Sequence, residues 1–331
     1  MNDVKRQHYV PRFLLKRFSG TDEMLSVFAR GQGHVFRSAP DGVAVQRYYN
    51  AAKLESGEVD TQTVEKKLGT IETAGSVVVE QMVSGKAPTP QQRTDFSLYL
   101  TSQDFRSLRK RQEFADMLLG IEQRGFPSHT IASVENYIRE VANASEATIK
   151  VDANKFSGKG GLKLEEDGSV SVDFEETVRA LNAAEHFAPL VAQMDWSIIR
   201  APKGEEFIIS DSPVQLYEDT RNLPKHTGPG YWRQDTCIAL PLDRRACFVA
   251  TRPSADRAIN WRPRFFVGEG KGADVRFYNN LQVNGCFKQV YASANLAWLA
   301  AKTAALPVSK SRLSFMPVDG DGKPVSVGMK R

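Results

Sequence analysis

Hydrophobic positions recur with the period of an α-helix over much of the first two thirds of the chain. In residues 61–83, apolar or small side chains fall on one stripe: Val64, Leu68, Ile71, Gly75, Val78 and Met82. Because side chains three and four residues apart share a helix face, this spacing predicts a helix with one buried side, N-capped by Asp60 or Thr61. The same period predicts further helices over about residues 90–123, 130–150 and 174–191.

A shorter pattern, typical of β-strands, occurs near both ends of the chain. Pro11 separates an extended lead-in from a short helix that we expect to start at about Arg12. Two strand-like runs, residues 25–30 and 34–36, flank a glycine-containing turn and predict a hairpin. After residue 194, β-branched and aromatic runs alternate with Pro and Gly; they cover residues 196–200, 206–210, 237–240 and 247–251.

This order of elements predicts an α+β fold, with a helical central region packed on a mostly antiparallel sheet formed late in the chain. We expect a single domain over residues 1–306, with one more helix at 275–300 that breaks near Gly285. The approximate bounds are residues 60–193 for the helical part, 194–300 for the sheet part and 307–331 for a polar tail.

Composition excludes several classes of protein. With 41% hydrophobic and 25% charged residues, the chain is typical of globular proteins, and no apolar run reaches the ~20 residues of a membrane helix. The N-terminus lacks the apolar core of a signal peptide, so we expect a cytoplasmic protein. A net charge of +5 permits contact with nucleic acid or another polyanion. Three separate cysteines without a CxxC pair predict buried thiols: Cys237, Cys247 and Cys286.

The most distinctive motif lies near the N-terminus, where Gln7-His8-Tyr9-Val10-Pro11 precedes Phe13, Leu14 and Phe18. Later segments add two glutamates seven residues apart, an aromatic-Arg-Ser step, a strand ending in Ser-Asp-Ser-Pro and paired asparagines. These are Glu65 and Glu72, Phe105-Arg106-Ser107, residues 210–213 and Asn279-Asn280. On these motifs the chain resembles the DUF4238 family, a group of mostly bacterial proteins of unassigned function.

The resemblance implies a shared set of polar residues rather than an activity. It adds Gln7, Tyr9 and Asn280 to the candidates for substrate binding. The chain departs from the family pattern at Leu108, where proline is usual, and this departure weakens the assignment of a family-typical turn at Arg106.

His8 is the leading candidate for chemistry among the five histidines. Its apolar and aromatic neighbours predict that this segment is buried, so the imidazole is held inside the fold. A histidine in that setting can act as a general base, a metal ligand or a phosphate contact. The alternative is a hydrogen bond to the backbone that docks the N-terminal segment.

Two acidic residues and one arginine form the second group of candidates. Seven residues are close to two helical turns, so Glu65 and Glu72 lie within about 20° of each other, beside the apolar stripe. They can bind a divalent cation, act as acid and base, or pair with basic residues of a neighbouring helix. Arg106 lies on the flank of its own helix, near Tyr99 and Gln103. A buried arginine needs a carboxylate or a phosphate, so we expect either a salt bridge to Glu65 or Glu72 or an anion clamp completed by substrate.

Asp211 ends a predicted strand, and Pro213 favours an extended conformation at Ser212. An acidic residue at the end of a strand can be a catalytic acid or a metal ligand. Asp-Ser-Pro also forms an Asx-turn readily, which gives Asp211 a structural role instead.

Well-known catalytic motifs are absent from the sequence: it has no Walker A loop, H-E-x-x-H, zinc-deaminase signature or GxGxxG after a strand. Two hypotheses stay open. The first is a hydrolase acting on a phosphodiester or another anionic substrate, with or without a divalent cation, in which His8, Glu65, Glu72 and Asp211 supply acid, base or ligation and Arg106 binds the substrate. The second is a non-catalytic module that binds nucleic acid or protein.

Overall fold

The computed structural model describes residues 6–50, 52–53, 59–60, 62–113, 162–164, 170–172, 175–218, 229–233, 235–252 and 262–308. The chain divides into two compact units: residues 1–111 with 173–309, and residues 112–172 with 310–331. In the second unit, β7 (Leu162–Leu164) and β8 (Val170–Val172) form an antiparallel hairpin. The elements described below belong to the first unit.

Three long helices form one layer: α2 (Thr63–Val83), α3 (Pro90–Phe105) and α6 (Glu175–Ala192). Helix α3 packs against both α2 and α6. It begins where predicted because Pro90 follows Thr89, whose hydroxyl accepts from the backbone N–H of Gln92 in a capping box. The predicted cap of α2 was wrong: Gln62 is the N-cap, because Asp60 pairs with Ala52 in the short hairpin of β5 (Ala52–Lys53) and β6 (Val59–Asp60).

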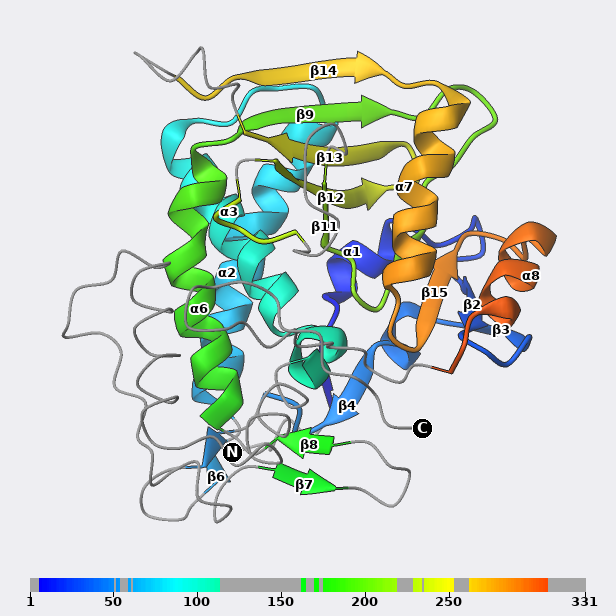
Figure 1. The fold of residues 1–331 in the computed structure, drawn as a ribbon, viewed down its shortest axis with the longest axis horizontal. Helices are drawn as coiled ribbons and strands as arrows, with labels where there is room; N and C mark the ends of the chain where they lie inside the picture. The colour runs from blue at the N-terminus through cyan, green and yellow to red at the C-terminus, as the bar shows by residue number, and fades with distance from the viewer. Residues whose placement is uncertain are drawn as a thin grey trace, which may run out of the picture. The chain divides into compact units, whose positions relative to one another are not determined.

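A five-stranded sheet forms a second layer, with the strands in the order β11-β12-β13-β9-β14. Every neighbouring pair is antiparallel except β14 and β9, which are parallel. In Figure 1 the strands follow one another from β14 at the outer edge, with α3 and α6 below them. The bounds are Gln215–Glu218 for β11, Thr236–Asp243 for β12, Ala246–Thr251 for β13, Asp195–Arg200 for β9 and Phe265–Glu269 for β14.

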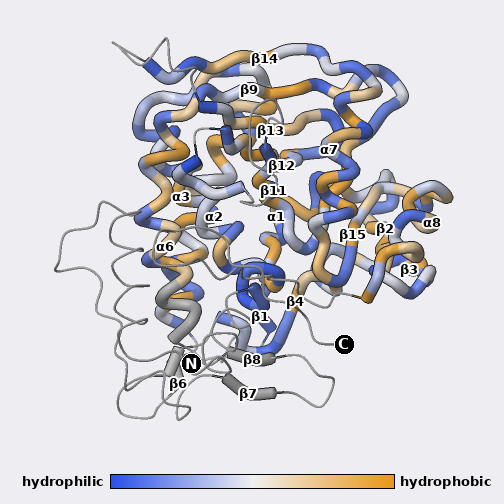
Figure 2. The backbone as a smooth tube through the Cα atoms, viewed as in Figure 1, coloured by the Kyte–Doolittle hydropathy of each residue, from blue (hydrophilic) through white to orange (hydrophobic). Residues whose placement is uncertain are grey.

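The core lies between these two layers. Figure 2 shows that β12 and β13 are largely hydrophobic, and nearly all of their residues are buried. Phe96 of α3 packs edge-on against Trp196 and Phe248 of the sheet, with ring centroids 5.3 and 4.9 Å away. A second aromatic stack joins α3 to α6, where Phe105 and Phe187 lie with their ring centroids 5.2 Å apart.

A smaller four-stranded sheet has the order β10-β15-β2-β3. Its strands are β10 (Ile209–Ser210), β15 (Gln289–Ala292), β2 (Leu25–Ala29) and β3 (Val35–Ser38). The β2–β3 hairpin confirms the predicted one, and Gly31 and Gly33 occupy its turn with φ of 71° and 60°, a region that favours glycine.

The C-terminal helix expected over residues 275–300 is the main correction to the predicted elements. The structure has α7 (Gly272–Gly285), then β15, then α8 (Ala297–Ala305). The break at Gly285 is as predicted, but β15 intervenes because its residues pair with both β2 and β10. Sheet pairing therefore overrides the helical period of this segment.

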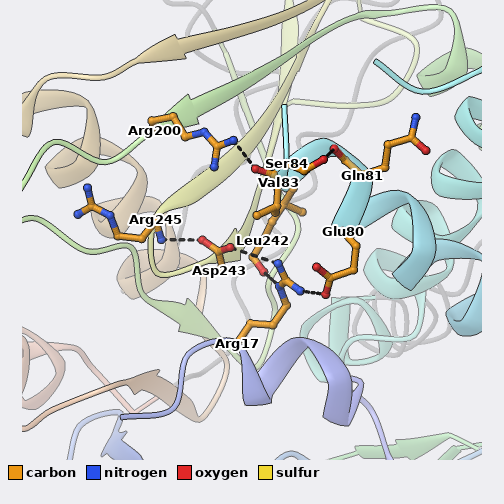
Figure 3. Close-up of polar contacts among 9 residues, drawn as sticks. All are labelled: Arg17, Glu80, Gln81, Val83, Ser84, Arg200, Leu242, Asp243 and Arg245. Carbon is orange, nitrogen blue, oxygen red and sulfur yellow. Dashed lines mark hydrogen bonds and ion pairs between the residues drawn. The ribbon is translucent and has the colours of Figure 1, made fainter. Parts of the chain in front are cut away.

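The N-terminal segment forms β1 (Arg6–His8), then α1 (Arg12–Lys16), as expected around Pro11. Strand β1 pairs with β4 (Val45–Arg47), and a 3-10 turn at Pro40–Gly42 precedes β4. In Figure 3, Arg17 joins this segment to the rest of the unit. Its guanidinium pairs with Glu80 of α2 and, at 3.2 Å, with Asp243 of β12, while its Nε donates to the Leu242 carbonyl at 2.9 Å.

The predicted α+β class is confirmed, since a helical layer packs on a mostly antiparallel sheet. The three cysteines are buried and free, as expected. The helix predicted over about residues 90–123 is not continuous: α3 ends at Phe105, and Arg106 and Ser107 separate it from helical residues 108–113. Predictions for residues 114–123, for the helix at 130–150 and for the tail beyond residue 308 lie outside the described residues.

Candidate functional site

The N-terminal motif is held by β-pairing and by the core. In the β1–β4 ladder, Gln7 lies opposite Gln46 and His8 opposite Val45, and the Tyr9 N–H continues the pairing by donating to the Ala44 carbonyl at 2.9 Å. Tyr9 is 6% exposed and Val10 is fully buried. Tyr9, Val10 and Leu14 are therefore buried as expected, whereas His8 and Phe13 are half-buried. Pairing with β4 gives His8 a defined position in the fold.

Helices α2 and α3 bring together two of the predicted site residues. Arg106, the C-cap residue of α3, is 3% exposed, and its Nη2 lies 2.6 Å from Glu72 Oε1. Its Nε and Nη2 also donate to Gln103 Oε1, at 3.2 and 2.8 Å. Gln103 Nε2 in turn donates to the Tyr9 carbonyl at 2.8 Å. The expected salt bridge between Arg106 and a glutamate of α2 is confirmed, and it is linked to the N-terminal motif.

Glu65 joins the same group from one end of α2. Asn50 Nδ2 donates to Glu65 Oε2 at 2.9 Å, and the Asn50 backbone N–H donates to Gln7 Oε1 at 2.6 Å. Burial raises the pKa of Glu65, with the Asn50 hydrogen bond and the charge of Arg106 acting in the opposite direction. Gln7 is thus a buried support for Asn50, and Glu65 holds its proton at a higher pH than an ordinary glutamate.

His8 is polarised by the backbone and carries one unpaired ring nitrogen. The imidazole makes a hydrogen bond with the backbone of Pro40, which has only a carbonyl to offer, and the buried Nε2 has no hydrogen-bond partner among the described residues. The bond to Pro40 therefore comes from Nδ1–H, which leaves a lone pair on Nε2 of the neutral ring. Burial lowers the pKa of His8, the Arg12 charge lowers it further, and the Asp41 and Glu72 charges oppose the shift.

Tyr99 belongs to this group, although the sequence analysis placed it only as a neighbour of Arg106. It is 1% exposed, and the described residues offer its hydroxyl no hydrogen-bond partner. The charges of Glu72 and Arg106 act on it. A signal was present in the sequence: Tyr99, Gln103 and Arg106 follow the i, i+4, i+7 spacing of one helix face. The structure adds that α2 covers this face with Glu72 and Gly75.

Asp211 has all its oxygens engaged elsewhere in the unit. It is fully buried, and its carboxylate accepts from the backbone N–H groups of Phe287, Lys288 and Gln289 at 2.7, 2.5 and 3.0 Å. Burial raises the pKa of Asp211 to about 6, although the three backbone donors act in the opposite direction. These contacts favour the structural alternative, and a catalytic role for Asp211 stays a prediction.

We call the side chains of Glu65, Glu72, Tyr99, Gln103 and Arg106 the α2–α3 group. Asn280 does not belong to it. It lies on α7, and its Oδ1 accepts from the ammonium group of Lys302 on α8. Its neighbour Asn279 is the buried one of the pair; it accepts from the Ile208 N–H at 3.0 Å and donates to the Glu206 carbonyl at 2.9 Å. Asn279 therefore fixes α7 against the segment that leads into β10, whereas Asn280 contacts α8.

The described residues contain neither a grouped set of metal ligands nor a membrane-spanning helix. Within these ranges, no three or more His, Cys, Asp or Glu side chains are grouped so that they could hold a metal ion. Glu65 and Glu72 are therefore not part of such a group among the described residues, and no step is derived through a metal ion. None of the described helices is long and apolar enough to cross a membrane.

Residues 6–295 match the model of a protein family described as "Protein of unknown function (DUF4238)". Because the match covers most of the chain, the protein belongs to this family, as the N-terminal motif indicated. No match was found among curated proteins or among solved structures. The family description names no activity, so the chemistry has to be inferred from the residues of the site.

Proposed function

We propose that the protein is a hydrolase that cleaves a phosphodiester or a similar anionic substrate at the group formed by His8, Glu65, Glu72 and Arg106. The observation that carries the proposal is the state of His8. Its Nδ1–H is held by the Pro40 carbonyl, its Nε2 lone pair is unpaired, and its lowered pKa keeps the ring neutral near pH 7. These are the properties of a general base.

The proposed step assigns one role to each side chain. His8 Nε2 takes a proton from a water molecule as the water oxygen attacks phosphorus. The bond between phosphorus and the leaving oxygen breaks, and that oxygen takes the proton of Glu65, whose raised pKa makes it the acid. Arg106 neutralises charge on the phosphoryl oxygens, and Glu72 holds the guanidinium in place at 2.6 Å.

The remaining motif residues support this arrangement. The Tyr9 carbonyl fixes Gln103, which holds Arg106, and the Gln7 side chain fixes Asn50, which holds Glu65. The N-terminal motif therefore connects to the acid, the base and the cation at once. Gln7 and Tyr9 act in this proposal as positioning residues, and contact between their side chains and the substrate stays a prediction.

The alternative function is a module that binds an anionic ligand, such as nucleic acid, without cleaving it. The observation that favours it is the pairing of Arg106 with Glu72 and Gln103, which satisfies the guanidinium without any substrate. In that case His8 only docks the N-terminal segment through Pro40. The two functions differ in whether removing the His8 imidazole changes a reaction rate.

The test is hydrolysis of bis(4-nitrophenyl) phosphate and of a single-stranded oligonucleotide, each with EDTA, Mg²⁺ or Mn²⁺. Loss of a general base costs about 10²- to 10⁴-fold in rate, so His8→Ala should lose at least a hundredfold. His34→Ala is the control, because His34 is an exposed turn residue stacked on Phe36. Cleavage by the wild type that His8→Ala leaves unchanged would sink the proposed site, and binding without cleavage by the wild type would favour the module.

We also infer a cytoplasmic location. The support is the state of the cysteines: the chain has three, and all of them are free and buried. A reducing compartment is where proteins commonly keep their thiols in this form.

A further inference from the structure

Tyr99 carries a hydroxyl group that the fold buries but does not pair. The residue is 1% exposed, and in the part of the chain that the structure describes its Oη has no hydrogen-bond partner. Burial of an unpaired hydroxyl destabilises a fold, whereas phenylalanine would fill the same space without that cost. Packing therefore accounts for the ring of Tyr99 and leaves its hydroxyl unexplained.

The ring of Tyr99 is held in one orientation. On one side it faces Gly75 of α2 so closely that a Cβ atom at Gly75 would overlap the ring carbons. Phe13 and Phe96 pack on it elsewhere, with ring centroids 5.6 and 5.9 Å from that of Tyr99. With the ring enclosed in this way, the position of the hydroxyl is set by the helices and not by solvent.

That position is beside the proposed reaction group. Tyr99 lies seven residues before Arg106 on the same face of α3, and Glu72 lies one turn before Gly75 on α2. The close contact of Gly75 with the Tyr99 ring places α2 against this face of α3, and the charges of Glu72 and Arg106 act on the hydroxyl. Burial, followed by the charge of Glu72, raises the pKa of Tyr99 well above its ordinary value, so the group is a donor and not a nucleophile.

We propose that Tyr99 is a further substrate-binding residue, whose O–H donates a hydrogen bond to an oxygen of the phosphate group that Arg106 neutralises. This assignment rests on the proposed function, and it narrows the ligand to one with an oxyanion. Arg106 provides charge, and Tyr99 adds a directional donor that only a bound acceptor can satisfy. The unpaired hydroxyl then destabilises the protein without ligand, and the hydrogen bond to a bound phosphate oxygen removes this destabilisation.

The test compares two buried tyrosines that differ in whether the hydroxyl is paired. Tyr231 is 6% exposed and donates to Asp104 Oδ2 at 2.9 Å, so it is the matched control for Tyr99. Affinity for inorganic phosphate is measured by calorimetry, and melting temperature by scanning calorimetry, for the wild type, Tyr99→Phe and Tyr231→Phe.

Tyr99→Phe should bind phosphate about ten- to a hundredfold more weakly, the usual effect of losing a hydrogen bond to a charged group, and should melt at the same or a higher temperature. Tyr231→Phe should melt lower and keep its phosphate affinity. Unchanged phosphate affinity in Tyr99→Phe would overturn the proposal, as would a wild type that does not bind phosphate, or a fall in melting temperature as large as that of Tyr231→Phe.

Failure of this proposal and failure of the proposed function can be told apart. If the wild type binds phosphate through Tyr99 but does not hydrolyse bis(4-nitrophenyl) phosphate, the binding role of Tyr99 is supported and the hydrolase function is contradicted. If the wild type hydrolyses the ester, and Tyr99→Phe changes neither the rate nor the phosphate affinity, the hydrolase function is supported and the role of Tyr99 is contradicted.

Discussion

The carboxylate of Asp211 is fully buried and the imidazole of His8 is half-buried, and the two groups also differ in their hydrogen-bond partners. Asp211 accepts three backbone hydrogen bonds from the segment that precedes and enters β15. His8 makes one bond, to Pro40, and among the described residues its Nε2 has no hydrogen-bond partner; the Tyr99 hydroxyl has none either. Buried polar groups in proteins are normally paired. The contacts of Asp211 thus favour a structural role, whereas His8 Nε2 and the Tyr99 hydroxyl have no hydrogen-bond partner among the described residues.

The N-terminal motif connects these two regions. Tyr9 shares a hydrogen bond with Tyr291, the residue of β15 that follows Val290, and its carbonyl accepts from Gln103 in the α2–α3 group. The N-terminal motif, which is one continuous segment of the sequence, therefore contacts two regions. In the region of Asp211 the carboxylate is fully hydrogen-bonded, and in the region of Arg106 some polar atoms are not. This difference in hydrogen bonding can be tested by substitutions that alter the contacts of one region and leave those of the other unchanged.

The largest effect is expected for Asp211→Asn. The amide has nearly the same shape, but its NH₂ would face backbone N–H groups that now donate to the carboxylate. We expect a loss of roughly 2–4 kcal/mol in the free energy of unfolding, measured by urea denaturation. Asp41→Asn is the control: this carboxylate is 57% exposed, so loss of its pair with Arg12 should cost about 0–1 kcal/mol. Equal stability in the two variants would remove the structural role of Asp211.

A smaller effect is expected for Gly75→Ala, which tests the packing beneath Tyr99. The new methyl group would overlap the Tyr99 ring, so α2 and α3 must shift, at a cost of about 1–3 kcal/mol. Gly69→Ala in the same helix is the matched control, because no atom lies within 4 Å of a Cβ at that position. There alanine should stabilise the helix by up to ~1 kcal/mol. The close approach of α2 to Tyr99 would be disproved if both variants gained stability.

The smallest effect is a change in the titration of His8. Arg12 lowers the pKa of His8 and Asp41 raises it, so Arg12→Gln should raise this pKa toward 6.5 and Asp41→Asn should lower it further. Both shifts should be small, because Arg12 and Asp41 are 52% and 57% exposed. Histidine ring resonances followed by NMR against pH measure them, and shifts of the same sign in both variants would contradict the assignment.

The same lowered pKa fixes the pH dependence of the proposed reaction. His8 is neutral above its folded pKa and gains a proton as the pH falls through that value, which lies below 6.5. The rate should therefore fall on the acid side, at a pH below 6.5. Stability should fall in the same direction, because the unfolded chain binds its proton at a higher pH than the native state does.

Sequence reasoning predicted part of the candidate site because that part depends on spacing along one element. The helical period placed Glu65 and Glu72 on one side of α2 and Arg106 beside Gln103, and it favoured a salt bridge between the two helices, which Arg106 and Glu72 form. It missed the unpaired state of Tyr99, because the lack of a partner depends on what every neighbouring element provides.

By itself, then, the sequence determined the elements whose pattern is local: the helices α2, α3 and α6, the β2–β3 hairpin, the burial of the N-terminal motif and the α+β class. Only the tertiary structure decided which polar groups are satisfied. It inserted β15 between α7 and α8 through pairing with two distant strands, and it paired Asp211 with backbone N–H groups 76 to 78 residues away. Whether a buried polar group has hydrogen-bond partners depends on contacts between segments far apart in the chain. The hydrophobic periodicity of one segment does not predict those contacts.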